Sequence, residues 1–201
     1  MEPPAVEASP WERRRSDMAM RIERCALELC VAQGIDKTTM EDIAKAAGIS
    51  RRTVYRYFGT IDEILIAQSK RSLTRISRSV AERPLSESVR EAFVNASRDH
   101  PPSDDERYIL ELGGQLCESQ PAPWWRAMGR VQAMTREVYE GAVAERLAAA
   151  GQDPKFAPMI AAVLIAVIGF TAQQSYADNG KFSPSAARLE EALAALSAIM
   201  R

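Results

Sequence analysis

The sequence predicts an all-α protein, and three features of the chain support that class. Apolar residues recur three and four positions apart, as they do on one face of a helix. Gly and Pro residues separate these stretches, often beside a Ser, Thr or Asp that suits a helix N-terminus. No run of alternating β-branched residues closed by Asn-Gly or Asp-Gly marks a β-hairpin. We therefore expect helices only.

The first helix is expected over residues 16–33, with Gly34 at its end. Its buried face would be made by four apolar residues spaced 4, 3 and 4 apart: Met18, Ile22, Cys25 and Leu29. Residues 1–15 precede it, with three prolines and three consecutive arginines. We expect this segment to be a flexible basic N-terminal arm.

Two short helices are expected next. Thr38 and Glu41 have the spacing of a capping box, which would open a helix that ends near Gly48, a residue suited to a left-handed backbone. Ser50 would cap the following helix, which ends at Gly59. The inward residues would be Met40, Ile43, Ala44, Ile49, Val54 and Phe58. Neither helix is long enough to be stable alone, so both must pack on their neighbours.

Thr60 and Glu63 form a second expected capping box, opening a long helix from Asp62 to Arg83. Five more helices are expected from the Pro and Gly positions, at 85–99, 104–119, 123–150, 154–177 and 185–200. The chain would thus divide into an N-terminal domain, 16–76, and a C-terminal helical domain, 84–201.

Charge and composition restrict the function. The net charge is -1, but residues 1–83 carry 15 Lys and Arg against 12 Asp and Glu, whereas residues 84–201 carry 11 against 15. The N-terminal excess is a weak indication of a polyanionic partner. The three cysteines, Cys25, Cys30 and Cys117, form no disulfide framework, and no apolar leader is visible, so we expect a cytoplasmic protein.

Catalysis is not expected, because the chain has a single histidine, His100, beside two prolines. Histidine-dependent triads and multi-histidine metal sites would need more than this one imidazole. Asp104, Asp105 and Glu106 suit the first turn of a helix through its dipole, so we do not interpret them as metal ligands. No catalytic residue, metal or cofactor is predicted.

Residues 39–58 have the organisation of a helix-turn-helix: a short helix, an Ala-Gly-Ile turn, and a second short helix with apolar residues on one side. On that second helix, Arg51, Arg52 and Tyr55 lie away from Val54 and Phe58. Arg can pair with a guanine edge through two hydrogen bonds, and Tyr can contact a phosphate or a thymine methyl group. This pattern indicates binding to double-stranded DNA.

The same segment resembles the TetR family of bacterial transcriptional regulators. The similarity lies in the pattern Thr-x-x-x-Ile-Ala-x-x-Ala-Gly-Ile-Ser at residues 39–50, followed by Thr-Val-Tyr-Arg-Tyr-Phe at 53–58. With the flanking helices it covers residues 16–76. The resemblance implies three N-terminal DNA-binding helices, a long fourth helix, and a helical C-terminal domain that dimerises and usually binds a small effector.

By position, the resemblance implies phosphate contacts at Thr39, Ser50, Thr53 and Tyr57 and base contacts at Arg51, Arg52 and Tyr55. Ile61 stands where members often carry Lys, so that phosphate contact is either lost or taken over by Arg56 or the arginines at 13–15. Simpler interpretations remain: Thr38 and Ser50 are suitable helix caps without DNA. Lys70, Arg71, Arg75 and Arg78 are interpreted as a solvated helix face rather than a second DNA site.

The stretch from Phe156 to Ala177 carries no charge. Its dense apolar part is shorter than the roughly 20 residues of a membrane span, so we expect it to be covered by protein, including a second copy of the chain. By analogy with the family, the dimer contact would involve Ala162, Ala166, Gly169, Ala172, Leu189, Leu193 and Leu196.

A small-molecule pocket would be lined mainly by apolar side chains. The candidates are Phe93, Leu112, Leu116, Cys117, Trp124, Trp125, Met128, Met134, Tyr139 and Phe170, each of which could instead belong to the core. The leading hypothesis is a homodimeric repressor released from a palindromic operator by a small, largely apolar effector. The alternatives are a ligand-independent architectural or cell-division DNA-binding protein, a helical-bundle enzyme, and an activator of the same fold.

Overall fold

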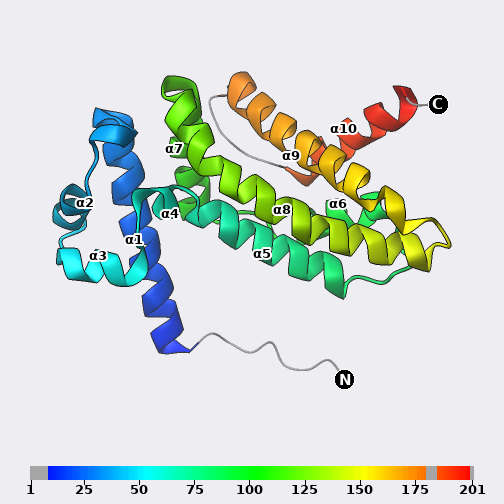
Figure 1. Ribbon diagram of the computed structural model, residues 1–201, viewed down its shortest axis with the longest axis horizontal. Helices are drawn as coiled ribbons and strands as arrows, with labels where there is room; N and C mark the ends of the chain where they lie inside the picture. The colour runs from blue at the N-terminus through cyan, green and yellow to red at the C-terminus, as the bar shows by residue number, and fades with distance from the viewer. Residues whose placement is uncertain (1–8, 180–184, 200–201) are drawn as a thin grey trace. The chain divides into compact units, whose positions relative to one another are not determined.

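The computed structural model describes residues 9–179 and 185–199, without the side chains of 172, 173, 175–179 and 199. Within these ranges the chain forms helices and no strand, which confirms the predicted class (Figure 1). The elements are α1 (Pro10–Gln33), η1 (Ile35–Lys37), α2 (Met40–Ala46), α3 (Arg51–Tyr57), α4 (Ile61–Leu65), α5 (Ala67–Glu82), α6 (Val89–Asp99), α7 (Asp104–Ser119), α8 (Pro121–Ala149), η2 (Pro154–Phe156), α9 (Ala157–Asn179) and α10 (Ala186–Ile199).

The chain divides into two compact units, Met1–Leu65 and Ile66–Arg201. The boundary falls inside the segment 16–76 that the sequence analysis treats as one domain. It also interrupts the long helix predicted from Asp62 to Arg83, because α4 and α5 are separate helices with Ile66 between them. The residues from Ile64 to Ala67 are all buried, a pattern that a continuous amphipathic helix with one apolar face does not produce.

Helix α1 begins six residues earlier than predicted. The Ser9 hydroxyl accepts a hydrogen bond from the Glu12 N–H at 3.2 Å, and the Glu12 carboxylate accepts one from the Ser9 N–H at 2.7 Å. With Pro10 at the first helical position, this capping box sets the start of the helix. The three arginines at 13–15 therefore lie in α1 and not in a flexible arm; residues 1–8 lie outside the described residues.

One apolar core holds the first unit together. It contains Ile22 from α1, Ile43 from α2 and Val54 from α3, each fully buried. The inward faces predicted for α1, α2 and α3 are confirmed, since the remaining predicted residues are buried in this core or packed against it: Met18, Cys25, Leu29, Met40, Ala44, Ile49 and Phe58. Gly34, with φ of 104°, ends α1 as expected.

In the second unit, α8 lies between α5 and α9 and contacts both, while α10 packs on α6 and α9 (Figure 1). The core here includes Phe93 and Tyr139, whose rings meet edge to face with centroids 4.7 Å apart. Burial raises the pKa of Tyr139 to about 12, so its hydroxyl stays protonated at physiological pH.

Arg146 of α8 closes the C-terminal end of α5. Its side chain is buried, and its guanidinium donates to the carbonyl of Pro84 at 2.9 Å and to those of Val80 and Arg83. The last carbonyls of a helix have no partner within the helix and carry its negative partial charge, so a buried cation is stabilised there. This contact ties α8 to the end of α5.

One helical window is long and apolar enough to cross a membrane, judged by length and composition within the described part of the chain. It spans Pro154–Thr171, has a mean hydropathy of 1.8, and is 22% buried. Most of this apolar segment is therefore exposed in the single chain.

We expect Gly113→Ala to destabilise the protein by about 1–3 kcal/mol, because a Cβ there would lie 2.9 Å from Cη2 of Trp124. Gly129→Ala is the matched control: it is helical and has nothing within 4 Å of the added Cβ. That variant should be neutral or stabilising by up to about 1 kcal/mol. Urea denaturation followed by tryptophan fluorescence measures both; equal stabilisation of the two variants would contradict the predicted clash.

Candidate nucleic-acid interface

The turn between α2 and α3 sets the position of α3. Gly48 has φ of +64°, a left-handed conformation that Gly adopts without strain, and the next N–H, of Ile49, donates to the Ala44 carbonyl at 3.0 Å. Ala47 is fully buried between the two helices. The tight turn and the small residue bring α2 and α3 into contact, as a helix-turn-helix requires.

The cap of α2 is Thr39, not the predicted Thr38. The Thr39 hydroxyl accepts from the Asp42 N–H at 3.1 Å and donates to the Asp42 carboxylate at 2.6 Å, which also accepts the Thr39 N–H. These side-chain and backbone hydrogen bonds lower the pKa of Asp42. Thr38 is buried and donates to the Gly34 carbonyl at 2.8 Å instead. Both threonines have an acidic residue three positions later, so sequence spacing alone could not distinguish them.

Helix α3 presents a polar face on the side opposite Val54. Arg51, Arg52, Tyr55 and Arg56 are exposed, with Tyr55 at 44%. The Arg51 guanidinium lies 5.4 Å from the centre of the Tyr55 ring and donates to its hydroxyl at 3.4 Å, and this hydrogen bond raises the pKa of Arg51. Arg52 makes no hydrogen bond or ion pair with any described residue, so its donors are available to a ligand.

Three of the hydroxyls expected to touch phosphates, those of Thr39, Ser50 and Thr53, already have hydrogen-bond partners close by in the chain. Ser50 caps α3 as predicted, accepting from the Thr53 N–H at 3.1 Å, and its oxygen lies 2.8 Å from the Thr53 hydroxyl. The Arg56 guanidinium stacks over the Tyr57 ring at 5.6 Å. Ile61 packs against the apolar core of the first unit, so the start of α4 offers no cation at that position. Phosphate contacts by Thr39, Ser50, Thr53, Arg56 and Tyr57 remain predictions.

The second expected capping box is only half formed. The Glu63 N–H donates to the Thr60 hydroxyl at 3.2 Å, but the Glu63 carboxylate accepts from the N–H of Gly59, one residue earlier, at 2.7 Å.

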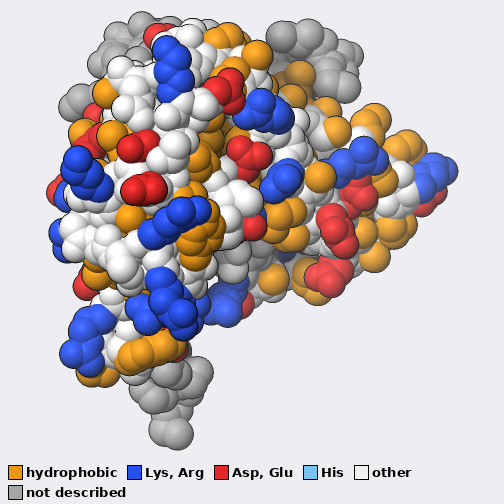
Figure 2. All heavy atoms as spheres, turned by 60° about the vertical axis from the view of Figure 1, so that its left-hand side comes forward, with side chains coloured by type: hydrophobic (Ala, Val, Ile, Leu, Met, Phe, Trp, Pro, Cys, Tyr) orange, Lys and Arg blue, Asp and Glu red, His pale blue; other side chains and the backbone are white. Residues whose placement is uncertain are grey.

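Figure 2 turns the side of the molecule that carries α2 and α3 in Figure 1 toward the viewer, and Lys and Arg side chains outnumber acidic ones on its lower part.

The ten residues predicted to line an apolar pocket do not share one environment. Trp125, Met134 and Phe170 are exposed, at 44%, 42% and 56%. Phe93, Leu112, Leu116, Met128 and Tyr139 are buried among other side chains, and Cys117 and Trp124 are half-buried. Three of the ten residues are therefore exposed in the single chain, and the pocket found along α5 beside His100 is lined by other residues. The pocket assignment stays a prediction. Helical spacing indicates a buried face but not whether that face meets a neighbour or a cavity.

The predicted dimer residues also separate into two sets. Ala162, Ala166 and Gly169 of α9 are exposed, and a Cβ at Gly169 would have nothing within 4 Å. Leu189 and Leu193 of α10 are buried in the core of the second unit, where α10 packs on α6, so they are not open to a partner. Leu196 is half-buried, and the side chain of Ala172 lies outside the described residues.

Among the described residues, no group of three or more His, Cys, Asp or Glu side chains is placed to hold a metal ion. The three free cysteines are buried or half-buried, and burial raises the pKa of each thiol.

A family profile described as bacterial regulatory proteins of the tetR family matches residues 24–67, which include the turn and α3. This segment of the chain is a TetR-type helix-turn-helix. Over 52 residues the chain is 44% identical to MftR of Mycobacterium tuberculosis, named as a candidate regulator of mycofactocin biosynthesis. That match covers 26% of each protein. The chain matches between 26% and 41% of the length of its curated relatives.

Solved structures show that the TetR-family fold extends beyond the matched segment. A TetR-family transcriptional regulator from Syntrophomonas wolfei aligns over 88% of this chain and 90% of its own, with a TM-score of 0.63 and 17% identity. FadR of Bacillus subtilis, solved in complex with stearoyl-CoA, aligns over 87% of this chain and 95% of its own, with a TM-score of 0.55 and 17% identity. At these identities the likeness shows the fold alone.

We expect Thr39→Ala to lower the free energy of unfolding of the first unit by about 1 kcal/mol, because α2 loses its N-terminal cap. Thr39→Ser keeps the hydroxyl and should retain most of that stability. Thermal and urea denaturation, followed by circular dichroism, would measure both variants. If alanine and serine at position 39 gave equal stability, the capping role assigned to the threonine hydroxyl would be wrong.

Proposed function

We propose that this protein is a homodimeric transcriptional repressor that binds a palindromic operator through α3 and is released by a small-molecule effector. The observation that carries the proposal is the exposed face of α3. Arg51, Arg52 and Tyr55 lie on the side of the helix that faces away from Val54 and the core, and the matched family is one of bacterial regulatory proteins.

Helix α3 has the chemistry of a recognition helix. Arg52 is exposed and unpaired, so it can donate two hydrogen bonds to O6 and N7 of a guanine. Arg51 is held over Tyr55, and this pair presents a cation and an aromatic hydroxyl together. In a two-fold symmetric dimer, the two α3 helices would enter successive major grooves about 34–36 Å apart.

The exposed apolar side of α9 supports the dimer. Met159, Val163 and Phe170 are 58%, 37% and 56% exposed, beside the small residues Ala162 and Ala166. An exposed apolar surface on a helix is unfavourable in water, and the small residues allow another helix to approach closely. We propose that the same surface of a second copy covers it.

Effector control would act through different affinities of the ligand for the two conformations of the dimer. A ligand that prefers the conformation with the wrong α3 spacing weakens DNA binding by that preference, typically about 1–3 kcal/mol. The apolar residues predicted to hold such a ligand differ in exposure, from fully buried to exposed, and do not by themselves indicate the nature of the effector.

We expect Arg52→Ala or Tyr55→Ala to reduce the preference for operator over random DNA by about tenfold or more, since a base contact contributes about 1–3 kcal/mol. Both side chains are exposed, so stability should change by less than about 0.5 kcal/mol. Footprinting and fluorescence anisotropy on DNA upstream of the protein's own gene would measure selectivity. Arg130→Ala, an exposed arginine of α8, is the matched control.

If the Arg52 and Tyr55 variants still preferred operator over random DNA as strongly as the wild-type protein does, α3 would not be the helix that contacts the bases. Binding at many unrelated sites, unaffected by any ligand, would favour the ligand-independent architectural protein instead. Increased transcription from the bound promoter would indicate an activator of the same fold.

We expect Val163→Glu to raise the dimer dissociation constant by about 100-fold or more, because two-fold symmetry would bury two unpaired carboxylates in one contact. Val138→Glu on α8 replaces a valine of similar exposure, 42% against 37%, and should leave the dimer intact. Sedimentation equilibrium would detect species of one or two 22.2 kDa chains. If the wild-type protein were monomeric, or both variants dimeric, the proposed interface would be wrong.

A further inference from the structure

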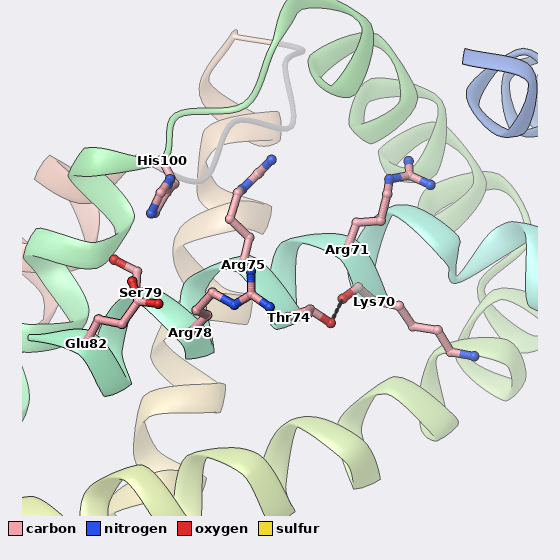
Figure 3. A pocket seen from close by; sticks show the side chains of 8 residues that line it. All are labelled: Lys70, Arg71, Thr74, Arg75, Arg78, Ser79, Glu82 and His100. Carbon is pink, nitrogen blue, oxygen red and sulfur yellow. Dashed lines mark hydrogen bonds between the residues drawn. The ribbon is translucent and has the colours of Figure 1, made fainter. Parts of the chain in front are cut away.

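The second unit contains a groove with a volume of about 520 Å³ (Figure 3). Seven of its lining residues come from α5, and His100, at the end of α6, completes it. The volume is in the range of small-molecule sites. The lining residues are Lys70, Arg71, Thr74, Arg75, Arg78, Ser79, Glu82 and His100.

The seven α5 residues lie on one face of the helix, at positions that repeat every four residues in two adjacent rows. Lys70, Thr74 and Arg78 form one row, and Arg71, Arg75 and Ser79 form the other. Figure 3 shows the His100 ring near Ser79. The Arg75 side chain extends from α5 toward the same side. The groove therefore carries a line of cations that spans about 12 Å along α5, at 1.5 Å per residue.

The cations of the groove exceed its anions. Glu106 of α7 accepts from Arg75 at 3.0 Å and from Gln68 at 3.2 Å. Burial raises the pKa of Glu106, but the hydrogen bonds from the Ser103 N–H, Gln68 and Arg75 outweigh it, so the net pKa is lowered and the group is ionised. With four cationic side chains against the carboxylates of Glu82 and Glu106, an excess of two positive charges remains.

Two hydrogen-bond donors in this lining have no acceptor among the described residues. Ser79 is 8% exposed, and its hydroxyl, which is not among the fully buried polar atoms, makes no hydrogen bond to another described residue. Several other helical hydroxyls, such as those of Thr74 and Ser97, donate to the carbonyl four residues earlier. The Nε of Arg75 is also buried without a partner. A buried donor without an acceptor is unfavourable, so a bound ligand with acceptor oxygens would satisfy the Arg75 Nε–H, and the Ser79 hydroxyl could donate to the same ligand.

We propose that this groove binds a small molecule that carries a phosphate group. A phosphate ester has a charge of about -1.5 to -2 at neutral pH and three acceptor oxygens, which match the charge excess and the unused donors. Arg78 and Lys70, which have no ion-pair partner among the described residues, are the principal charge contacts. Ser79, Arg75 and His100 supply directed donors. The groove is large enough to hold an organic group beside the phosphate, as in a nucleotide or coenzyme A.

The test is calorimetric titration of the full-length protein at low ionic strength with AMP, coenzyme A and adenosine. We expect AMP, coenzyme A or both to bind, and adenosine, which lacks the phosphate, to bind at least tenfold more weakly. Whichever of AMP and coenzyme A binds with the higher affinity indicates which of these two kinds of ligand the groove prefers.

Variants connect the binding to this groove. Arg78→Gln should weaken the binding of the stronger probe at least tenfold, and Ser79→Ala, which removes one hydroxyl and keeps every charge, several-fold. Arg90→Gln, an exposed arginine of α6 outside the groove, should change it less than twofold. Circular dichroism checks that each variant is folded; if Arg78→Gln does not fold, the comparison of Ser79→Ala with Arg90→Gln decides.

The proposal is overturned if neither phosphate-bearing probe binds at millimolar concentration, if adenosine binds equally well, or if the control variant loses as much affinity as the groove variants. It is also overturned if a non-operator DNA duplex displaces the probe equally from wild-type and Arg52→Ala protein, because the groove would then be a DNA-backbone surface. The titrations contain no operator, so failure here and failure of operator binding are separate results.

Discussion

The exposed polar face of α3 depends on one shared apolar core. Helices α2 and α3 have seven residues each, too few to persist in water alone. They exist because Ile43, Val54 and Ile22 are buried together, with Ala47 at the crossing of α2 and α3. The side chains buried in the core determine which ones remain outside, so the outward direction of Arg52 and Tyr55 is a consequence of burying Val54.

The caps and the turn give this small core its geometry. Gly48 allows the left-handed turn, while Thr39 and Ser50 satisfy backbone N–H groups that the short helices leave without partners. The same two hydroxyls are among the expected phosphate contacts. If both roles hold, each hydroxyl must give up or share its capping hydrogen bond when the protein binds DNA. Capping and DNA recognition then compete for the same hydroxyl oxygen.

Helix α5 organises the second unit in a different way. Its C-terminal end is tied to α8 by the buried guanidinium of Arg146, and its inner face packs in the core through Leu73 and Val80. Its outer face concentrates cations that the neighbouring carboxylate of Glu106 only partly balances. A helix held at its end and on one side can present a rigid row of charges, a suitable platform for an anionic ligand.

Much of the structure of the first unit can be predicted from the sequence. Periodicity, Gly34, Gly48 and Ser50 predict α1 to α3 and their inward faces, because caps and amphipathic spacing are local properties. Local signals are ambiguous at Thr38 and Thr39, both of which fit a capping box, and the Ser9–Glu12 box, which has the same spacing, starts α1 before the predicted position. Each error shifted a boundary without changing which residues are buried.

Sequence patterns thus predict most of the helices, the outward arginines of α3 and the resemblance of residues 16–76 to the TetR family, all of which depend on neighbours within a few positions. The break at Ile66, the burial of Leu189 and Leu193, and the cationic groove follow from long-range packing. An apolar face has the same spacing whether it meets α6, a second chain or water, and a basic helix face becomes a groove only when His100 from another helix lies beside it. Those outcomes depend on which elements meet in three dimensions, and one-dimensional periodicity carries no information about that choice.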